Sequence, residues 1–163
     1  YSIFNVGEYT FAPWKVVWGR IGNYLEAAVA SQSIPQETIS FVACHNETEA
    51  HYIAALVNSI PFQFAAHSYS QAGGKSFGSP HILENVCVPR FNAQHAIHSH
   101  LAALSQEAHR IAPVASDSDT KARLAAIEAE IDSLAAQLWG LTDAELAEIR
   151  ASLKELKGAT DAP

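Results

Sequence analysis

The sequence predicts an α/β (α+β) protein, with a small mixed β-sheet and packed helices in residues 1–112 and a helical hairpin or arm in residues 113–163. Three observations predict this class. Segments rich in β-branched and aromatic residues fall in the first part, amphipathic segments follow them, and leucine and isoleucine recur at heptad spacing in the last part. The length of 163 residues and a hydrophobic content of 48% suit one domain with an extension.

Three strands are expected in the first part. Residues 11–20 contain Val16 and Val17 between two tryptophans, a composition typical of strands, and Gly19 interrupts the pattern. Residues 38–44 form a second apolar run, and residues 85–89 form a short third run. These three segments constitute the predicted sheet.

Two helical regions are expected between and after these strands. Asn46 with an acid three residues later predicts a capped helix from residue 47 to about residue 60, which Pro61 breaks before residues 62–69 resume it. Asn92 is the predicted cap of a further helix. Its expected buried face consists of Ile97, Leu101, Leu104, Ala108 and Ile111.

Residues 113–120 read as a polar linker to the predicted C-terminal arm. After it, apolar residues recur at 3, 4, 3, 4 spacing, which is typical of a helix packed lengthwise on another helix: Leu124, Ile127, Ile131, Leu134 and Leu138. Gly140 ends that helix, and Thr142 with Glu145 forms a capping box for the last one. The arm is therefore a helical hairpin, or it lies against the preceding helix.

Charge is distributed unevenly along the chain. The formal net charge is -7, but residues 1–112 contain five Lys/Arg and seven Asp/Glu, whereas residues 113–163 contain five and ten. All eight histidines lie in the first part. Since neutralisation of phosphates supplies most non-specific affinity for DNA, this composition argues against tight DNA binding by the chain alone.

The lack of a recognisable targeting signal and the use of cysteine favour a cytoplasmic protein. The sequence has no apolar run of the roughly 18 residues that a membrane helix needs and no recognisable signal peptide. Cys44 and Cys87 lie far apart, which suits a reducing compartment. The absence of any methionine predicts that the chain is a fragment of a longer protein.

Several motifs that suggest catalysis are incomplete. Gly74-Lys75-Ser76 lacks the earlier glycine of a phosphate-binding loop, and Pro80 stands where a helix should continue. Residues 74–78 fit a nucleophile elbow in letters but lack the flanking strand and helix. The cluster of His95, His98 and His100 lacks the paired spacing of zinc ligands and reads as solvated helix residues. Cys44-His45 has no acid placed to complete a nucleophile. We therefore expect no catalytic centre and no metal site.

Five segments in a fixed order carry a resemblance to a known family. They are residues 14–23 (WKVVWGRIGN), 34–42 (IPQETISFV), 49–59 (EAHYIAALVNS), 78–91 (GSPHILENVCVPRF) and 131–142 (IDSLAAQLWGLT). Their order resembles the C-terminal specificity region of TaqI-like adenine-N6 DNA methyltransferases from bacterial type II restriction–modification systems.

This resemblance implies a target-recognition domain that positions duplex DNA and is not itself catalytic. In such enzymes a separate N-terminal domain binds S-adenosylmethionine and transfers the methyl group. The expected partners are therefore double-stranded DNA and the methyltransferase domain of the same parent protein, and no cofactor or membrane is expected for this chain.

The resemblance and the polar residues together indicate candidate DNA contacts. Glycines in the loop of residues 71–79 allow close backbone approach, and Gln71 has the group that pairs with adenine. Arg20, Asn23 and Tyr24 offer a cation, an amide and a ring in a second group. The complete set is Lys15, Arg20, Asn23, Tyr24, Gln71, Gly73, Gly74, Lys75, Ser76 and Arg90. The loop also fits an ordinary surface connection, and in a straight strand Lys15 and Arg20 point apart.

A second function class remains open at this point. The heptad-like helix and the acidic C-terminal part also fit a protein-interaction or oligomerisation module, with the α/β part as scaffold. An enzymatic role for this chain is a distant third possibility.

Overall fold

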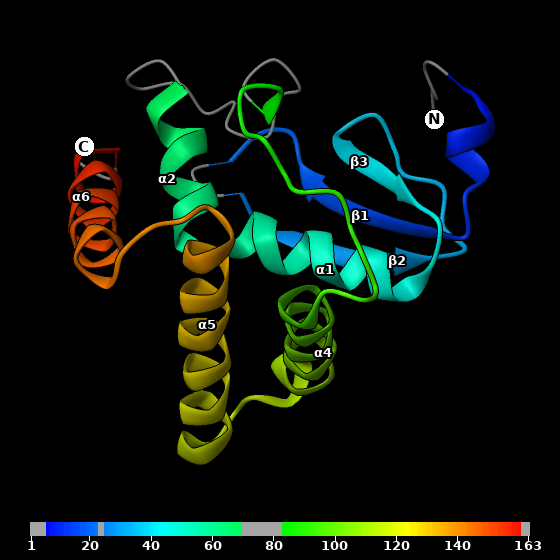
Figure 1. Cartoon of the computed structure of the whole chain (residues 1–163). Coiled ribbons are helices and arrows are strands. Elements are labelled where there is room, and N and C mark those ends of the chain that lie inside the picture. The colour runs from blue at the N-terminus through cyan, green and yellow to red at the C-terminus, as the bar shows by residue number, and fades with distance from the viewer. Residues whose placement is uncertain (1–5, 23–24, 70–82, 161–163) are drawn as a thin grey trace.

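The computed structural model of the chain describes residues 6–22, 25–69 and 83–160, with side chains described up to residue 156. A three-stranded sheet packs against α1, and the remaining helices lie on the far side of α1 and beside it (Figure 1). The strands are β1 (Trp14–Gly19), β2 (Ala27–Ser31) and β3 (Ile39–Cys44). The helices are η1 (Glu8–Phe11), α1 (Glu47–Asn58), α2 (Ile60–Tyr69), α4 (Ala96–Ile111), η2 (Ala112–Val114), α5 (Ser118–Leu138) and α6 (Asp143–Thr160). The α/β class expected from the sequence is confirmed.

The sheet is antiparallel in its described part, with strand order β2-β1-β3, so the expectation of a mixed sheet was wrong. Trp18 pairs with Ala27 on one side and with Ser40 on the other. The central position of β1 agrees with its strong strand propensity. β2 was not predicted, because four of its five residues are alanine or serine and its strand conformation depends on pairing with β1.

The third predicted strand, residues 85–89, is not a strand. A turn forms there, in which the Val86 N–H donates to the Leu83 carbonyl at 3.0 Å. Carbonyl groups of this segment bond to side chains from distant helices: Trp139 Nε1 donates to Cys87 O and Tyr52 Oη donates to Pro89 O, both at 2.9 Å. Pro89 also lacks the N–H that a central strand requires.

The helix caps largely follow the sequence prediction. Asn46 accepts a hydrogen bond from the Glu49 N–H at 2.9 Å, and Thr142 and Glu145 form the expected capping box. Asn92 does not cap α4: its side chain accepts from the Gln94 N–H, and the helix begins later, after His95. α5 begins inside the expected linker, where Asp117 caps it.

Two apolar clusters form the core of the described part of the chain. One joins the sheet to α1 and α2 and contains Val16 and Trp18; the other joins α1, α4 and α5 and contains Leu101 and Ile127. α5 packs on α4, while α6 packs mainly on α2 rather than on α5 (Figure 1). The sequence left two arrangements open, a helical hairpin and an arm packed on the preceding helix. α5 adopts the second, because it packs on α4. Because α5 completes a core cluster, removing it would expose apolar side chains of α1 and α4.

Asn58 holds the outer edge of β2. Its side-chain amide donates to Ala27 O and its carbonyl oxygen accepts from the Ala27 N–H, both at 2.8 Å. The amide thus replaces the backbone of a neighbouring strand at this position.

Within the described residues, no helix is long and apolar enough to cross a membrane.

We expect Asn58→Ala to lower the free energy of unfolding by about 1–2 kcal/mol, because it leaves a strand N–H and C=O without partners. Urea denaturation measures this change. Asn58→Asp keeps the acceptor and loses the donor, so its stability should lie between wild type and the alanine variant. An alanine variant as stable as wild type would show that the amide contributes nothing to holding this edge.

Candidate functional site

Lys15, one of the candidate DNA contacts, is buried. Its side chain is 1% exposed, and Nζ donates to the Ala12 carbonyl and lies over the Phe41 ring, 5.9 Å from its centroid. Because successive side chains of a strand point to opposite faces, Lys15 and Val16 lie on different faces of the sheet, as expected. The face that carries Lys15 is covered by other residues and is not exposed to solvent at this position. Lys15 therefore offers no contact to DNA in this structure.

Arg20 and Arg90 are exposed. Arg20 follows β1 directly, its backbone N–H donates to Thr38 O at 3.0 Å, and within the described residues its guanidinium donates to Glu37 O at 3.4 Å. Arg90 follows Pro89 in an irregular segment. The remaining candidates lie outside the described residues: Asn23, Tyr24, Gln71, Gly73, Gly74, Lys75 and Ser76.

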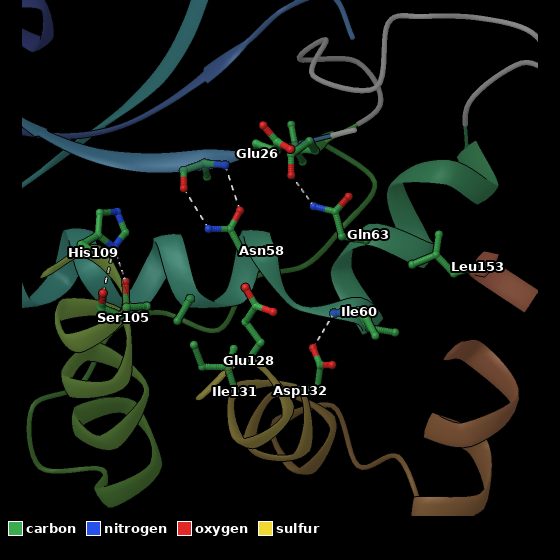
Figure 2. Close-up of a pocket in the computed structure, with 14 residues that line it drawn as sticks. Glu26, Asn58, Ile60, Gln63, Ser105, His109, Glu128, Ile131, Asp132 and Leu153 are labelled. Atoms are coloured by element: carbon green, nitrogen blue, oxygen red, sulfur yellow. Dashed lines mark hydrogen bonds between the residues drawn. The ribbon is translucent and has the colours of Figure 1, made fainter. Parts of the chain in front are cut away.

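A pocket of about 600 Å³ lies between β2 and the helices α1, α2, α4, α5 and α6 (Figure 2). Its apolar walls include Leu25, Ile60, Ile131 and Leu153. Volumes of this size are typical of small-molecule sites, which combine apolar walls with a few polar groups. The pocket was not predicted from the sequence, because its lining comes from six elements that are separated along the chain.

Asp132 is the most buried carboxylate of the pocket, at 6% exposure. It accepts a hydrogen bond from the Ile60 N–H at 2.8 Å, at the start of α2, and one from Arg150 Nη2 of α6 at 3.0 Å. Burial raises the pKa of Asp132, and the two hydrogen bonds and the Arg150 charge oppose that rise. Asp132 therefore joins α5 to α2 and α6.

Glu128 lies one turn before Asp132 on α5, and its carboxylate projects into the pocket toward α1 (Figure 2). Burial and then the charge of Asp132 raise its pKa. Among the described residues, none forms a hydrogen bond or an ion pair with Glu128. Glu26, just before β2, supplies a third carboxylate to the lining.

Gln63 is the buried amide of the lining, at 6% exposure. Its Nε2 donates to Leu25 O and to Val57 O, and these two bonds fix the orientation of the amide. Its oxygen, Oε1, then has no hydrogen-bond donor in the described part of the chain. A buried acceptor of this kind is uncommon, because leaving it unpaired costs free energy.

A histidine pair borders the pocket. The Val29 N–H donates to His109 Nε2 at 3.0 Å, so His109 is neutral and its Nδ1 donates to Ser105 O at 2.8 Å. His51 Nδ1 lies 3.1 Å from Ser105 Oγ, and its ring stands edge-on to the His109 ring at 4.9 Å. Burial, and then His109, lower the pKa of His51 to about 4. Both imidazoles are thus built into the fold in the neutral form.

Among the histidines and cysteines that the structure describes, His98, His45 and Cys44 are candidates for a nucleophile or a metal ligand. His98 is buried, accepts from the Asn92 N–H at 3.0 Å and stacks on Tyr52, so its expected solvated position was wrong. His45 pairs with Glu49 at 2.8 Å, but burial raises the pKa of the neighbouring Cys44 to about 11. No group of three or more His, Cys, Asp or Glu among the described residues is arranged to hold a metal ion.

Comparison of the chain with protein-family models, curated proteins and solved structures found no match.

Proposed function

We propose that the chain is the target-recognition domain of a bacterial adenine-N6 DNA methyltransferase of a restriction–modification or phage-defence system, which acts in the cytoplasm and positions duplex DNA for a catalytic domain outside this chain. The order of the five sequence segments supports this proposal. In the structure, the exposed guanidinium of Arg20 carries it. S-adenosylmethionine would be bound by the catalytic domain.

Arg20 combines a fixed backbone with an exposed side chain. Its N–H extends the ladder between β1 and β3, while its guanidinium makes one long hydrogen bond to a carbonyl and no ion pair with the described residues. Arginine in this situation has most of its five donors left for phosphate or for guanine. A rigid strand end also orients such a contact more precisely than a loop does.

The start of α5 lies away from this position. β1 ends at the upper side of the view in Figure 1, whereas α5 begins at the bottom and α6 lies beside α2. The cap and the first turn of α5 contain the acidic residues Asp117 and Asp119. Their repulsion of phosphates favours the strand end over that end of the structure for DNA.

The alternative function, a protein-interaction module acting through the heptad-like helix, receives less support. Of the a/d residues of α5, Ile127 and Ile131 are buried, and Leu124, Leu134 and Leu138 are partly buried against the core cluster. This face is therefore occupied within the chain. A partner would have to bind elsewhere.

We expect Arg20→Ala to weaken binding of the full chain to a random duplex pool at low salt. Loss of one arginine contact typically costs about 1–3 kcal/mol if it reads a base, or reduces the salt slope by about 1 if it binds phosphate. Fluorescence anisotropy at several salt concentrations measures both quantities. Lys121→Ala is the matched control, because it removes one exposed positive charge from the start of α5, the end of that helix that lies at the bottom of the view in Figure 1.

The control separates local contact from overall charge. Equal effects of Arg20→Ala and Lys121→Ala would contradict a DNA-binding surface at the end of β1. Absence of DNA binding by both variants and by wild type would contradict the proposal for the isolated chain.

A further inference from the structure

The two outer edges of the sheet differ. On the edge formed by β2, the backbone groups of Ala27 bond to the Asn58 amide at 2.8 Å, and the Val29 N–H donates to His109 Nε2 at 3.0 Å. Side chains of helices therefore occupy hydrogen-bonding positions of that edge. β3 forms the other edge and packs on β1 and α1, while α4 and α5 lie on the far side of α1 from the sheet (Figure 1).

The pairing of β3 with β1 determines which backbone groups of β3 point outward. The Arg20 N–H donates to the Thr38 carbonyl, in register with the ladder between these strands. Backbone groups in an antiparallel strand alternate between its two sides. The N–H and C=O groups of Ile39, Phe41 and Ala43 therefore face away from β1.

Most of these outward groups lack a partner in the described part of the chain. The Ile39 N–H donates to Gln36 O at 3.0 Å, but none of the described residues bonds to the N–H or C=O of Phe41 or Ala43. The strand also lacks the features that usually protect an edge, because its sequence, ISFVAC, has no charge and no proline and its register with β1 is uninterrupted. An edge of this kind is a template for another strand.

The outward groups are arranged symmetrically about Phe41. Ile39 and Ala43 lie two residues on either side of it, so an antiparallel β3 of a second copy, centred on Phe41, places an N–H opposite a C=O at each outward position. Phe41 then pairs with Phe41 of the second copy, and Ala43 pairs with Ile39 of the second copy. A surface that complements itself in this way forms a two-fold dimer.

The charges at and around β3 favour the same pairing. The strand itself has no charge that would repel its own copy or attract a charged peptide. Glu37 precedes Phe41 by four residues and His45 follows it by four, so Glu37 of one copy lies at the end of the strand where His45 of the other copy lies. The His45 side chain is 84% exposed, and its Nδ1 contacts Glu49 at 2.8 Å. The protonated form of His45 is attracted to both carboxylates.

We propose that the chain forms a homodimer in which β3 pairs with β3 of a second copy, so that the two three-stranded sheets become one continuous sheet. The two Phe41 residues exchange hydrogen bonds, and each Ala43 N–H donates to the Ile39 carbonyl of the other copy. Val42, which is 40% exposed at this edge, becomes covered. The dimer does not require DNA and goes beyond the target recognition proposed above.

Sedimentation velocity of the full chain, without DNA and over concentrations up to the submillimolar range, tests this proposal. We expect a concentration-dependent species with twice the mass of the chain. Ala43→Pro removes an outward N–H from each copy and no bond to β1. We expect about tenfold weaker dimerisation of this variant, because two hydrogen bonds of the interface are lost. A wild-type chain that stays monomeric at all concentrations would overturn the proposal.

Ser31→Pro is the matched control, because it makes the same change at the outer edge of β2. The Gln32 N–H donates to Pro13 O in the ladder with β1, so the Ser31 N–H points away from β1. We expect this variant to dimerise as wild type does. Equal weakening by Ser31→Pro and Ala43→Pro would place the dimer contact on another surface and contradict the proposal.

Val42→Lys is a second test that leaves every backbone group of β3 in place. It adds the kind of charge that protects the edges of natural sheets, so we expect at least tenfold weaker dimerisation. A Val42→Lys dimer as tight as that of wild type would also contradict pairing through β3. Urea denaturation verifies that the three variants fold.

Discussion

Asp132→Ala should lower the free energy of unfolding by about 2–4 kcal/mol, the largest effect that we expect for any single carboxylate of this chain. Asp132 caps α2 through the Ile60 N–H, although the two residues are 72 positions apart. Alanine leaves that N–H without its acceptor and leaves Arg150 without its carboxylate. The expected decrease in the free energy of unfolding is the sum of two contributions, one from a helix cap and one from a partly buried ion pair.

The isosteric variant separates the two contributions. Asp132→Asn keeps an oxygen for the Ile60 N–H and loses the charge that attracts Arg150. Because burial raises the pKa of Asp132, the charged form is disfavoured at this position, and the neutral amide should cost less than about 1.5 kcal/mol. Urea denaturation at pH 7 measures all variants. Asp119→Ala, an exposed acid near the start of the same helix, is the control and should change stability by about 0.5 kcal/mol or less. A similarly small loss in Asp132→Ala would contradict the role assigned to this residue.

Acidification from pH 7 to pH 5 should lower the free energy of unfolding by about 2 kcal/mol through His51 alone. The pKa of His51 is about 4 in the folded chain, below the ordinary value of 6.5 that applies when the chain is unfolded. Between these values the unfolded state binds more protons, so stability falls as the pH drops through 6.5 toward 4 and is retained above 6.5. The cause is the burial of the imidazole beside His109 and Ser105.

A histidine on the surface provides the comparison for this pH effect. His51→Gln retains a polar group for Ser105 but cannot be protonated. Acidification from pH 7 to pH 5 should therefore lower its free energy of unfolding by about 2 kcal/mol less than it lowers that of wild type. His100→Gln changes an exposed histidine that pairs with Glu130 and should retain the steep acid dependence of wild type. The measurement is urea denaturation of the three proteins at both pH values. If His51→Gln lost as much stability as wild type on acidification, His51 would not be the titrating group.

The local patterns of the sequence predicted several elements correctly. The cap at Asn46, the capping box of Thr142 and Glu145, and the buried stripes of α4 and α5 all depend on residues three or four positions apart. Such neighbours are in contact whenever the helix forms. Their spacing is therefore readable without knowledge of the rest of the fold.

The site could not be predicted in the same way. Arg20 was identified as a cation at the end of a strand, and the structure places it there with its side chain exposed. Lys15 was expected at the surface, but the strand alternation that fixes its side of the sheet says nothing about what covers that side. The pocket carried no sequence signal, since no two of its carboxylates and amides form a recognisable motif.

The order of the helices, the apolar faces of α4 and α5, and the strands at β1 and β3 follow from the amino-acid sequence alone. Contacts between distant segments are needed to establish that residues 27–31 form β2, that residues 85–89 do not form a strand, and that six elements line a pocket. The difference lies in the range of the interactions. Helical hydrogen bonds and caps join neighbours in the chain, whereas strand pairing, burial of Lys15 and the bond from Ile60 to Asp132 require partners that the fold brings together from distant positions.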